Sequence, residues 1–78
     1  QNGSSLVPVG VVEIRGVFER GDTVRVLDPN GREIARGLVH YASADLERIR
    51  GAKSEAIGQI LGFDYGEEVI HRNDLVLL

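Results

Sequence analysis

Two histidines, His40 and His71, are the side chains of this sequence best suited to metal binding or proton transfer. Each lies on or at the end of an expected strand. Neither has a second histidine or a glutamate at the spacing of a metal-binding helix motif. The sequence contains no cysteine, which excludes thiolate metal sites and disulfide bonds. We therefore interpret both histidines as structural or surface groups, the alternative being a two-histidine site assembled by folding.

The serines lack the context of a catalytic nucleophile. None lies in a Gly-x-Ser-x-Gly motif. Ser43 and Ser54 stand where expected helices begin, so we interpret them as N-caps. No serine is therefore predicted to act in catalysis.

Phosphate binding and paired-carboxylate catalysis have equally weak signals. Residues 51–54 (Gly-Ala-Lys-Ser) resemble the end of a phosphate loop, but the lysine does not follow the glycine directly and the upstream glycine is missing. Glu67 and Glu68 are adjacent on an expected strand, so their side chains point to opposite faces. We predict no catalytic, cofactor-binding or metal-binding residue in this chain.

Nucleic-acid contact has the strongest candidate residues. Cationic, imidazole and aromatic side chains surround the turn between the expected helices and the strand before it: Arg36, His40, Tyr41, Arg48, Arg50 and Lys53, with Arg72 in a later turn. On a curled sheet they would line a shallow groove, with cations holding phosphates and Tyr41 stacking a base. Interleaved acidic residues and a net charge of −3 favour the alternative, an ordinary solvated face.

The elements that must position these residues fit within one small domain of 78 residues. Hydrophobic residues make up 42% and charged residues 27%, which is typical of a soluble globular domain. No apolar run approaches the twenty or so residues of a membrane span. Together with the missing cysteines, this predicts a cytoplasmic protein that does not bind membranes.

Alternating apolar and polar residues predict strands at Val11–Phe18, Thr23–Leu27 and Glu33–Tyr41. Residues 28–31 (Asp-Pro-Asn-Gly) predict a type I turn with a bulge between the second and third strands. The alternation slips near Gly37, where we expect a bulge or sharp bend. The residues expected to face inward from the first two strands are Val12, Ile14, Phe18, Val24 and Val26.

Two short helices follow, the first after Ser43 and the second after Ser54, ending at Gly51 and Gly62. Their expected buried residues are Leu46, Ile49, Ile57, Ile60 and Leu61. Strands are then predicted at Glu67–His71 and Leu75–Leu78, with a turn between them. This order predicts a mainly β fold with short helices (α+β), in which a curled sheet or small barrel is plugged by the helices.

The opening residues, Gln1 to Ser5, have the composition of a linker. We therefore expect residues 1–10 to be a linker from an upstream domain and residues 11–78 to be the folded domain. The chain is accordingly predicted to be a piece of a longer polypeptide.

Most of the chain resembles the PUA domain, a family named after pseudouridine synthases and archaeosine transglycosylases. The resemblance rests on residues 16–22 (Gly-Val-Phe-Glu-Arg-Gly-Asp), Val24, Val26, and residues 28–39, from the Asp-Pro-Asn-Gly turn to Val39. Later matches include Tyr41, Ser43, Asp45, Leu46, Ile49, Gly51, Ser54, Ile57, residues 60–62 and residues 68–72. His40, Ala42 and residues 73–74 depart from the family pattern. In particular, the chain resembles the PUA domain at the C-terminus of the bacterial glutamate 5-kinase family.

The resemblance implies a pseudo-barrel of mixed strands with two short helices. It also implies a parent enzyme that phosphorylates L-glutamate with ATP and Mg²⁺ in proline biosynthesis. The catalytic residues and the ATP and Mg²⁺ sites would lie in a separate kinase domain, leaving no cofactor in this one.

Two roles for the domain itself follow from the resemblance. The first is a non-catalytic regulatory or assembly role, with the kinase domain and other copies of the parent enzyme as partners. The second is RNA binding, for which the family implies a surface through Gly37, Tyr41, Ser43, Arg48 and Lys53.

Overall fold

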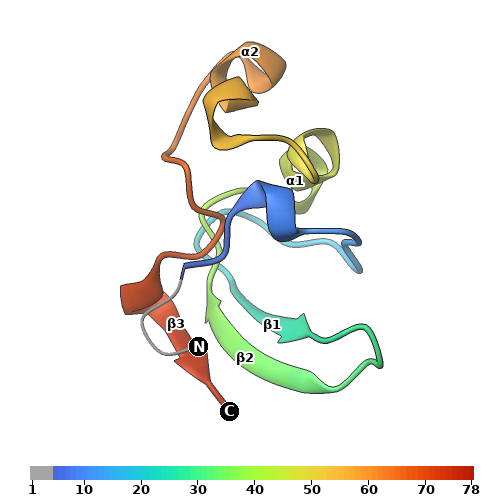
Figure 1. The fold of residues 1–78 in the computed structure, drawn as a ribbon. Helices are drawn as coiled ribbons and strands as arrows, with labels where there is room; N and C mark the ends of the chain where they lie inside the picture. The colour runs from blue at the N-terminus through green and yellow to red at the C-terminus, as the bar shows by residue number, and fades with distance from the viewer. Residues whose placement is uncertain (1–4) are drawn as a thin grey trace.

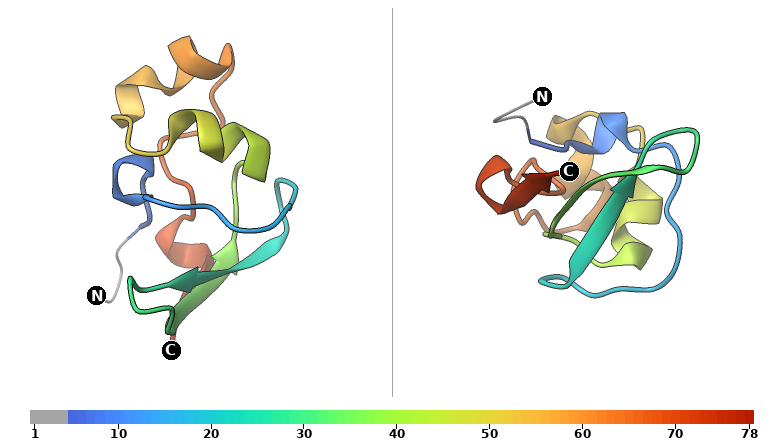
Figure 2. Two further views of the ribbon diagram at one scale, coloured as in Figure 1. Left: turned by 90° about the vertical axis from the view of Figure 1, so that its right-hand side faces the viewer. Right: turned by 90° about the horizontal axis from the view of Figure 1, so that it is seen from below.

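The computed structural model describes residues 5–78. A sheet and a pair of helices lie on opposite sides of the domain, with the segment from residue 11 to 18 crossing between them (Figures 1 and 2). The strands are β1 (Thr23–Leu27), β2 (Glu33–Leu38) and β3 (Leu75–Leu77), and the helices are α1 (Ser43–Ile49) and α2 (Ile57–Leu61). Short 3₁₀ turns span Pro8–Gly10 (η1), Ser54–Ala56 (η2) and Arg72–Asp74 (η3).

The sheet is antiparallel, in the order β1-β2-β3. The α+β class is therefore confirmed. The described residues form three strands where the sequence pattern predicts five. The expected strand Glu67–His71 is reduced to a single bridge, in which Ile70 pairs with Leu6.

The predicted strand at Val11–Phe18 is wrong. These residues have no ladder partner in the described chain, and Gly16 takes a φ of +80°, which interrupts an extended strand. Ile14 and Phe18 still pack against the core, as their alternation predicts. The predicted inward position of Val12 is wrong, since Val12 is 79% exposed and Val11 packs against the core in its place. The alternation therefore holds for Ile14 and Phe18 but not at the start of the segment.

The turn between β1 and β2 is confirmed. Asp28 Oδ1 accepts hydrogen bonds from the backbone N–H groups of Asn30 and Arg32, both at 2.9 Å. Gly31 has a φ of +85°, and the register shifts between Val26 and Leu27. The bulge therefore lies beside the turn, where the sequence chemistry demands a positive φ.

The bulge expected at Gly37 is wrong. Gly37 pairs regularly with Val24 of β1 and Leu75 of β3. A Cβ atom there would lie 2.6 Å from Ile70 Cγ2 and 2.7 Å from the Asp74 carbonyl oxygen. A glycine is needed at this position because the 70–75 segment passes too close for any side chain.

The helix ends match the expected glycines but not the expected caps. Gly51 and Gly62 have φ values of +79° and +84° directly after the helices. The N-cap residues are Ala42 for α1 and Lys53 for η2, and neither makes a side-chain cap bond. Ser43 and Ser54 instead bond to distant loops, so their predicted capping roles are wrong.

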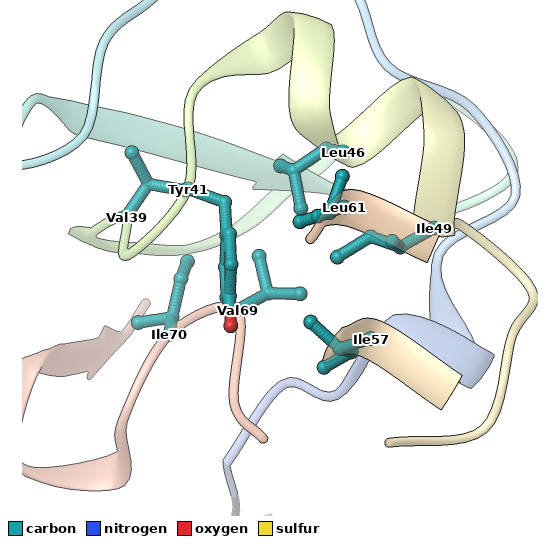
Figure 3. Packing of buried hydrophobic residues seen from close by; sticks show 8 residues of the cluster. All are labelled: Val39, Tyr41, Leu46, Ile49, Ile57, Leu61, Val69 and Ile70. Carbon is teal, nitrogen blue, oxygen red and sulfur yellow. The ribbon is translucent and has the colours of Figure 1, made fainter. Parts of the chain in front are cut away.

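The hydrophobic core lies between the helices and the strand ends, and Figure 3 shows its eight residues. It combines both helices with the end of the β2 segment and the 69–70 segment: Val39, Tyr41, Leu46, Ile49, Ile57, Leu61, Val69 and Ile70. The helix residues among them are those that the helical periodicity predicts. The helices are short, so their stability depends on this packing.

The expected linker, residues 1–10, has its first four residues outside the described part of the chain. The rest packs onto the domain, since Leu6 N–H bonds to the Ile70 carbonyl at 3.0 Å and Pro8 is buried. The Pro8 carbonyl accepts from Gly51 N–H at 2.8 Å. The folded body therefore extends back to at least Leu6, rather than beginning at Val11.

Candidate functional site

The five residues predicted to form an RNA or partner surface do not form one. Gly37, Tyr41 and Ser43 are buried, whereas Arg48 and Lys53 are exposed. Gly37 faces inward in the alternation of β2, which continues past the strand to Tyr41, and Ser43 is a buried residue at the start of α1.

Tyr41 is fully buried, with 0% of its surface exposed, and its ring lies within the core (Figure 3). Its hydroxyl donates to the Gly66 carbonyl at 2.6 Å and accepts from Tyr65 N–H at 2.9 Å. Burial raises the pKa of the Tyr41 phenol above its usual value, while the Tyr65 N–H opposes that shift. Tyr41 therefore holds the 64–66 loop in place and offers no ring face for stacking.

Ser43 joins the start of α1 to the segment before β1. Its Oγ accepts from Phe18 N–H at 3.1 Å and donates to the Phe18 carbonyl at 3.2 Å. Both polar atoms of the Phe18 backbone are thus satisfied by one side chain. This is a structural role.

The arginines at the helix turn also hold the fold. Arg48 donates to the Ile60 carbonyl, and Arg50 donates to the Val12 carbonyl. Arg50 also pairs with Glu47 at 3.0 Å. The guanidinium groups expected to line a groove are therefore engaged with protein oxygens.

The histidines do not meet. His40 Nε2 lies 3.2 Å from Asp74 Oδ2, and His71 Nδ1 accepts from Asn73 N–H at 3.0 Å. In residues 5–78, no three His, Asp or Glu side chains gather closely enough to hold a metal ion.

An aromatic patch that sequence reasoning missed is formed by Arg20, Phe63 and Tyr65. The Phe63 and Tyr65 ring centroids are 5.0 Å apart, and the Arg20 guanidinium carbon lies 3.9 Å from the Tyr65 centroid. Phe63 and Tyr65 are 38% and 44% exposed. In the sequence, this patch is indicated by two aromatic residues in a loop bounded by Gly62 and Gly66. Aromatic faces beside a cation are suited to stacking on a planar ligand.

A cleft of about 320 Å³ runs along β1, and we call it the β1 cleft. One wall is the segment from Gly10 to Arg15, and the other is β1 with the following turn as far as Pro29. Its remaining lining residues are mostly apolar: Leu6, Phe18, Leu46, Val69 and Ile70. Val24, Arg25, Val26 and Leu27 all line this cleft. Since the side chains of consecutive strand residues point to opposite faces, a cleft that touches all four must extend to the edge of β1.

The sheet has a partly apolar outer face, formed by Ile34, Leu38 and Val76 together with Arg25 and Arg36. Leu38 and Val76 are 43% and 62% exposed. Arg25 lies opposite Arg36 across the ladder, and Arg36 lies opposite Val76. This outer sheet face has the character of a modest interface between domains.

No helix in the part of the chain that the structure describes is long and apolar enough to cross a membrane.

Comparison with known proteins gives one family and one group of relatives. The family described as "PUA domain" matches residues 1–61. Glutamate 5-kinase of Dictyoglomus thermophilum is 58% identical over 78 residues, which is 100% of this chain and 21% of that protein. Glutamate 5-kinases of Geobacter sp. (strain M21) and Deinococcus radiodurans are 54% and 53% identical over the same length, covering 21% and 22% of those proteins. The chain thus spans about one fifth of the length of these curated relatives.

Proposed function

The chain belongs to the PUA domain family, and we propose that it is the accessory PUA domain of a glutamate 5-kinase. The main support is identity of 53–58% along the whole chain to proteins of that name, each about five times as long. The longer protein would transfer phosphate from ATP to L-glutamate in proline biosynthesis. ATP and Mg²⁺ would then bind outside these 78 residues.

Within that enzyme we assign the domain a regulatory or assembly role. The outer sheet face supports this role, because it leaves apolar side chains exposed beside two arginines. Such a surface suits contact with a kinase domain or with another copy of the enzyme. The polar side chains that the sequence offers for chemistry or binding instead make hydrogen bonds within the fold, as the contacts of Tyr41, Ser43, Arg48 and Arg50 show.

The test uses the full-length enzyme with and without residues 5–78. We expect removal of the domain to change the oligomeric mass, measured by light scattering, or the inhibition by proline. If both are unchanged, the assigned role is wrong. If the full-length protein does not phosphorylate glutamate, the assignment to this kinase is wrong.

Point variants locate the surface. Leu38→Glu and Val76→Glu place charges on the outer sheet face, and we expect them to reproduce the effect of deletion. Val17→Glu is the matched control, since Val17 is 90% exposed and belongs to none of the strands. Circular dichroism checks that each variant folds. If the control and the face variants behave alike, a different surface makes the contact.

RNA binding is the second candidate, and the aromatic patch favours it. Titration with structured RNA at low and moderate salt tests it, because phosphate contacts weaken as salt rises. We expect Tyr65→Ala to reduce such binding and Lys53→Ala to reduce its salt dependence. Unchanged amide chemical shifts at low salt would rule out the RNA role.

A further inference from the structure

The edge of β1 beside the cleft has backbone groups available for another strand. β1 is an edge strand, and Val39 N–H bonds to the Asp22 carbonyl at 3.0 Å. The alternation of an antiparallel ladder then directs the backbone groups of Thr23 and Arg25 away from β2. In residues 5–78, no backbone hydrogen bond joins these groups to a further segment. An extended chain lying here would satisfy them.

The opposite wall of the β1 cleft is fixed, so the cleft stays open. Gly51 N–H holds the Pro8 carbonyl, and the Arg50 guanidinium holds the Val12 carbonyl. These bonds tie residues 8–12 to the end of α1 instead of to β1. The wall therefore stands apart from the strand edge, although its own sequence alternates like a strand (Figure 2, left).

The positive charge of Arg25 on β1 indicates which side chain an added strand should carry beside it. Arg25 lies opposite Arg36, and Arg36 already pairs with Glu33. Among the described residues, Arg25 has no ion-pair partner. A strand added at this edge would place one side chain beside Arg25 on the outer face, and an acidic residue there is favourable. The residues on either side of it would point inward, toward apolar lining such as Ile14 and Leu46.

A second copy of this chain fits the edge poorly. Two β1 strands paired edge to edge would bring their Arg25 residues opposite or diagonally adjacent, with Arg36 beside each. The wall at residues 10–15 would also obstruct the approach of a second sheet. A single extended segment meets neither obstacle.

We propose that the β1 cleft is a docking site for an extended strand with an apolar–acidic–apolar pattern. The strand comes from the part of the longer polypeptide outside these 78 residues. The relatives are about five times as long as this chain, which leaves ample sequence to supply it. This source for the strand rests on the proposed function, whereas the site rests on the geometry and charge of the β1 cleft.

The first experiment tests the site. The ¹⁵N-labelled chain is titrated with the capped peptide Thr-Val-Glu-Val-Thr at millimolar concentrations. We expect amide shifts at Thr23 and Arg25, and binding about two- to five-fold weaker for the peptide with lysine in place of glutamate. Arg25→Glu should invert that preference. Arg25→Pro removes an N–H that points away from β2, so it should abolish binding while the fold persists. If β1 shows no shifts, or if both peptides bind equally, the site is refuted.

The second experiment tests the source of the strand. A benzophenone amino acid replaces Thr23, which is exposed on β1 and leaves Arg25 intact, in the full-length protein, and mass spectrometry identifies what it captures on illumination. Capture of a segment outside residues 1–78 of the same polypeptide supports the proposal. Capture of another copy, or only of residues 10–15, overturns it. Failure of the proposed kinase assignment would instead appear as a full-length protein that does not phosphorylate glutamate, while peptide binding persisted.

Discussion

Gly37→Ala is the substitution whose cost the structure defines most directly. The added Cβ would lie 2.6 Å from Ile70 Cγ2 and 2.7 Å from the Asp74 carbonyl oxygen. An ordinary carbon–carbon contact is about 3.5–4.0 Å, so about 1 Å of room is missing. Ile70 could adjust its side chain, but a carbonyl moves only if the backbone moves. Relief therefore requires β3 to shift away from β2.

Overpacking of this kind costs about 1–3 kcal/mol, and the backbone obstacle puts Gly37→Ala at about 2–3 kcal/mol. Domains of this size have a free energy of unfolding of roughly 4–12 kcal/mol, so the loss is large. We expect the midpoint of thermal unfolding to fall by about 10–20 °C. We also expect faster amide exchange at Val76 and Leu78, whose N–H groups face β2, because β3 is displaced.

Gly58→Ala is the matched control. Gly58 lies inside α2, and a Cβ there would meet nothing within 4 Å. We expect it to raise the free energy of unfolding by about 0.5–1 kcal/mol. Urea denaturation of both variants measures the contrast. If Gly37→Ala is as stable as the parent while Gly58→Ala is stabilised, the close approach of β3 is refuted.

Three further substitutions test the polar contacts. Tyr41→Phe leaves the Gly66 carbonyl without its donor and should cost about 1–3 kcal/mol in urea denaturation at neutral pH. The raised pKa of Tyr41 keeps the folded phenol protonated while the unfolded one ionises near pH 10. This contribution is therefore full below pH 10 and is lost above it, so the parent should lose stability at alkaline pH more steeply than Tyr41→Phe. Ser43→Ala removes both bonds to Phe18 and should cost about 1–2 kcal/mol in the same assay, and an effect within error would contradict its structural role. Asp28→Ala removes two bonds in the exposed turn and should lower the free energy of unfolding by about 1 kcal/mol, with the β1–β2 amides exchanging faster.

Local chemistry made part of the fold predictable. The turn at residues 28–31 follows from its own four residues, and the spacing of Leu46, Ile49, Ile57 and Leu61 defines the buried faces of the helices. The segment at Val11–Phe18 shows the limit of such reasoning. Alternation placed Ile14 and Phe18 correctly and Val12 wrongly, because a strand needs a neighbour to keep its faces in register, and that neighbour depends on the rest of the molecule.

The candidate site was less predictable because its residues are far apart in the sequence. Tyr41 is buried by the loop at residues 64–66, and nothing near Tyr41 in the sequence indicates that contact. The Arg20 contact with Tyr65 spans a separation nearly twice as long. The exposed character of Arg48 and Lys53 was correctly foreseen, since long charged side chains at a helix turn rarely lie inside.

The bridge between Leu6 and Ile70 makes the domain sensitive to tension at its N-terminal end. Leu6 N–H and the Leu6 carbonyl both bond to the 69–70 segment, and Ile70 abuts Gly37 at the centre of the sheet. A pull on the residues before Leu6 would load the bond from Arg72 N–H to Ser5 Oγ and this bridge, and would pass the strain to the middle strand.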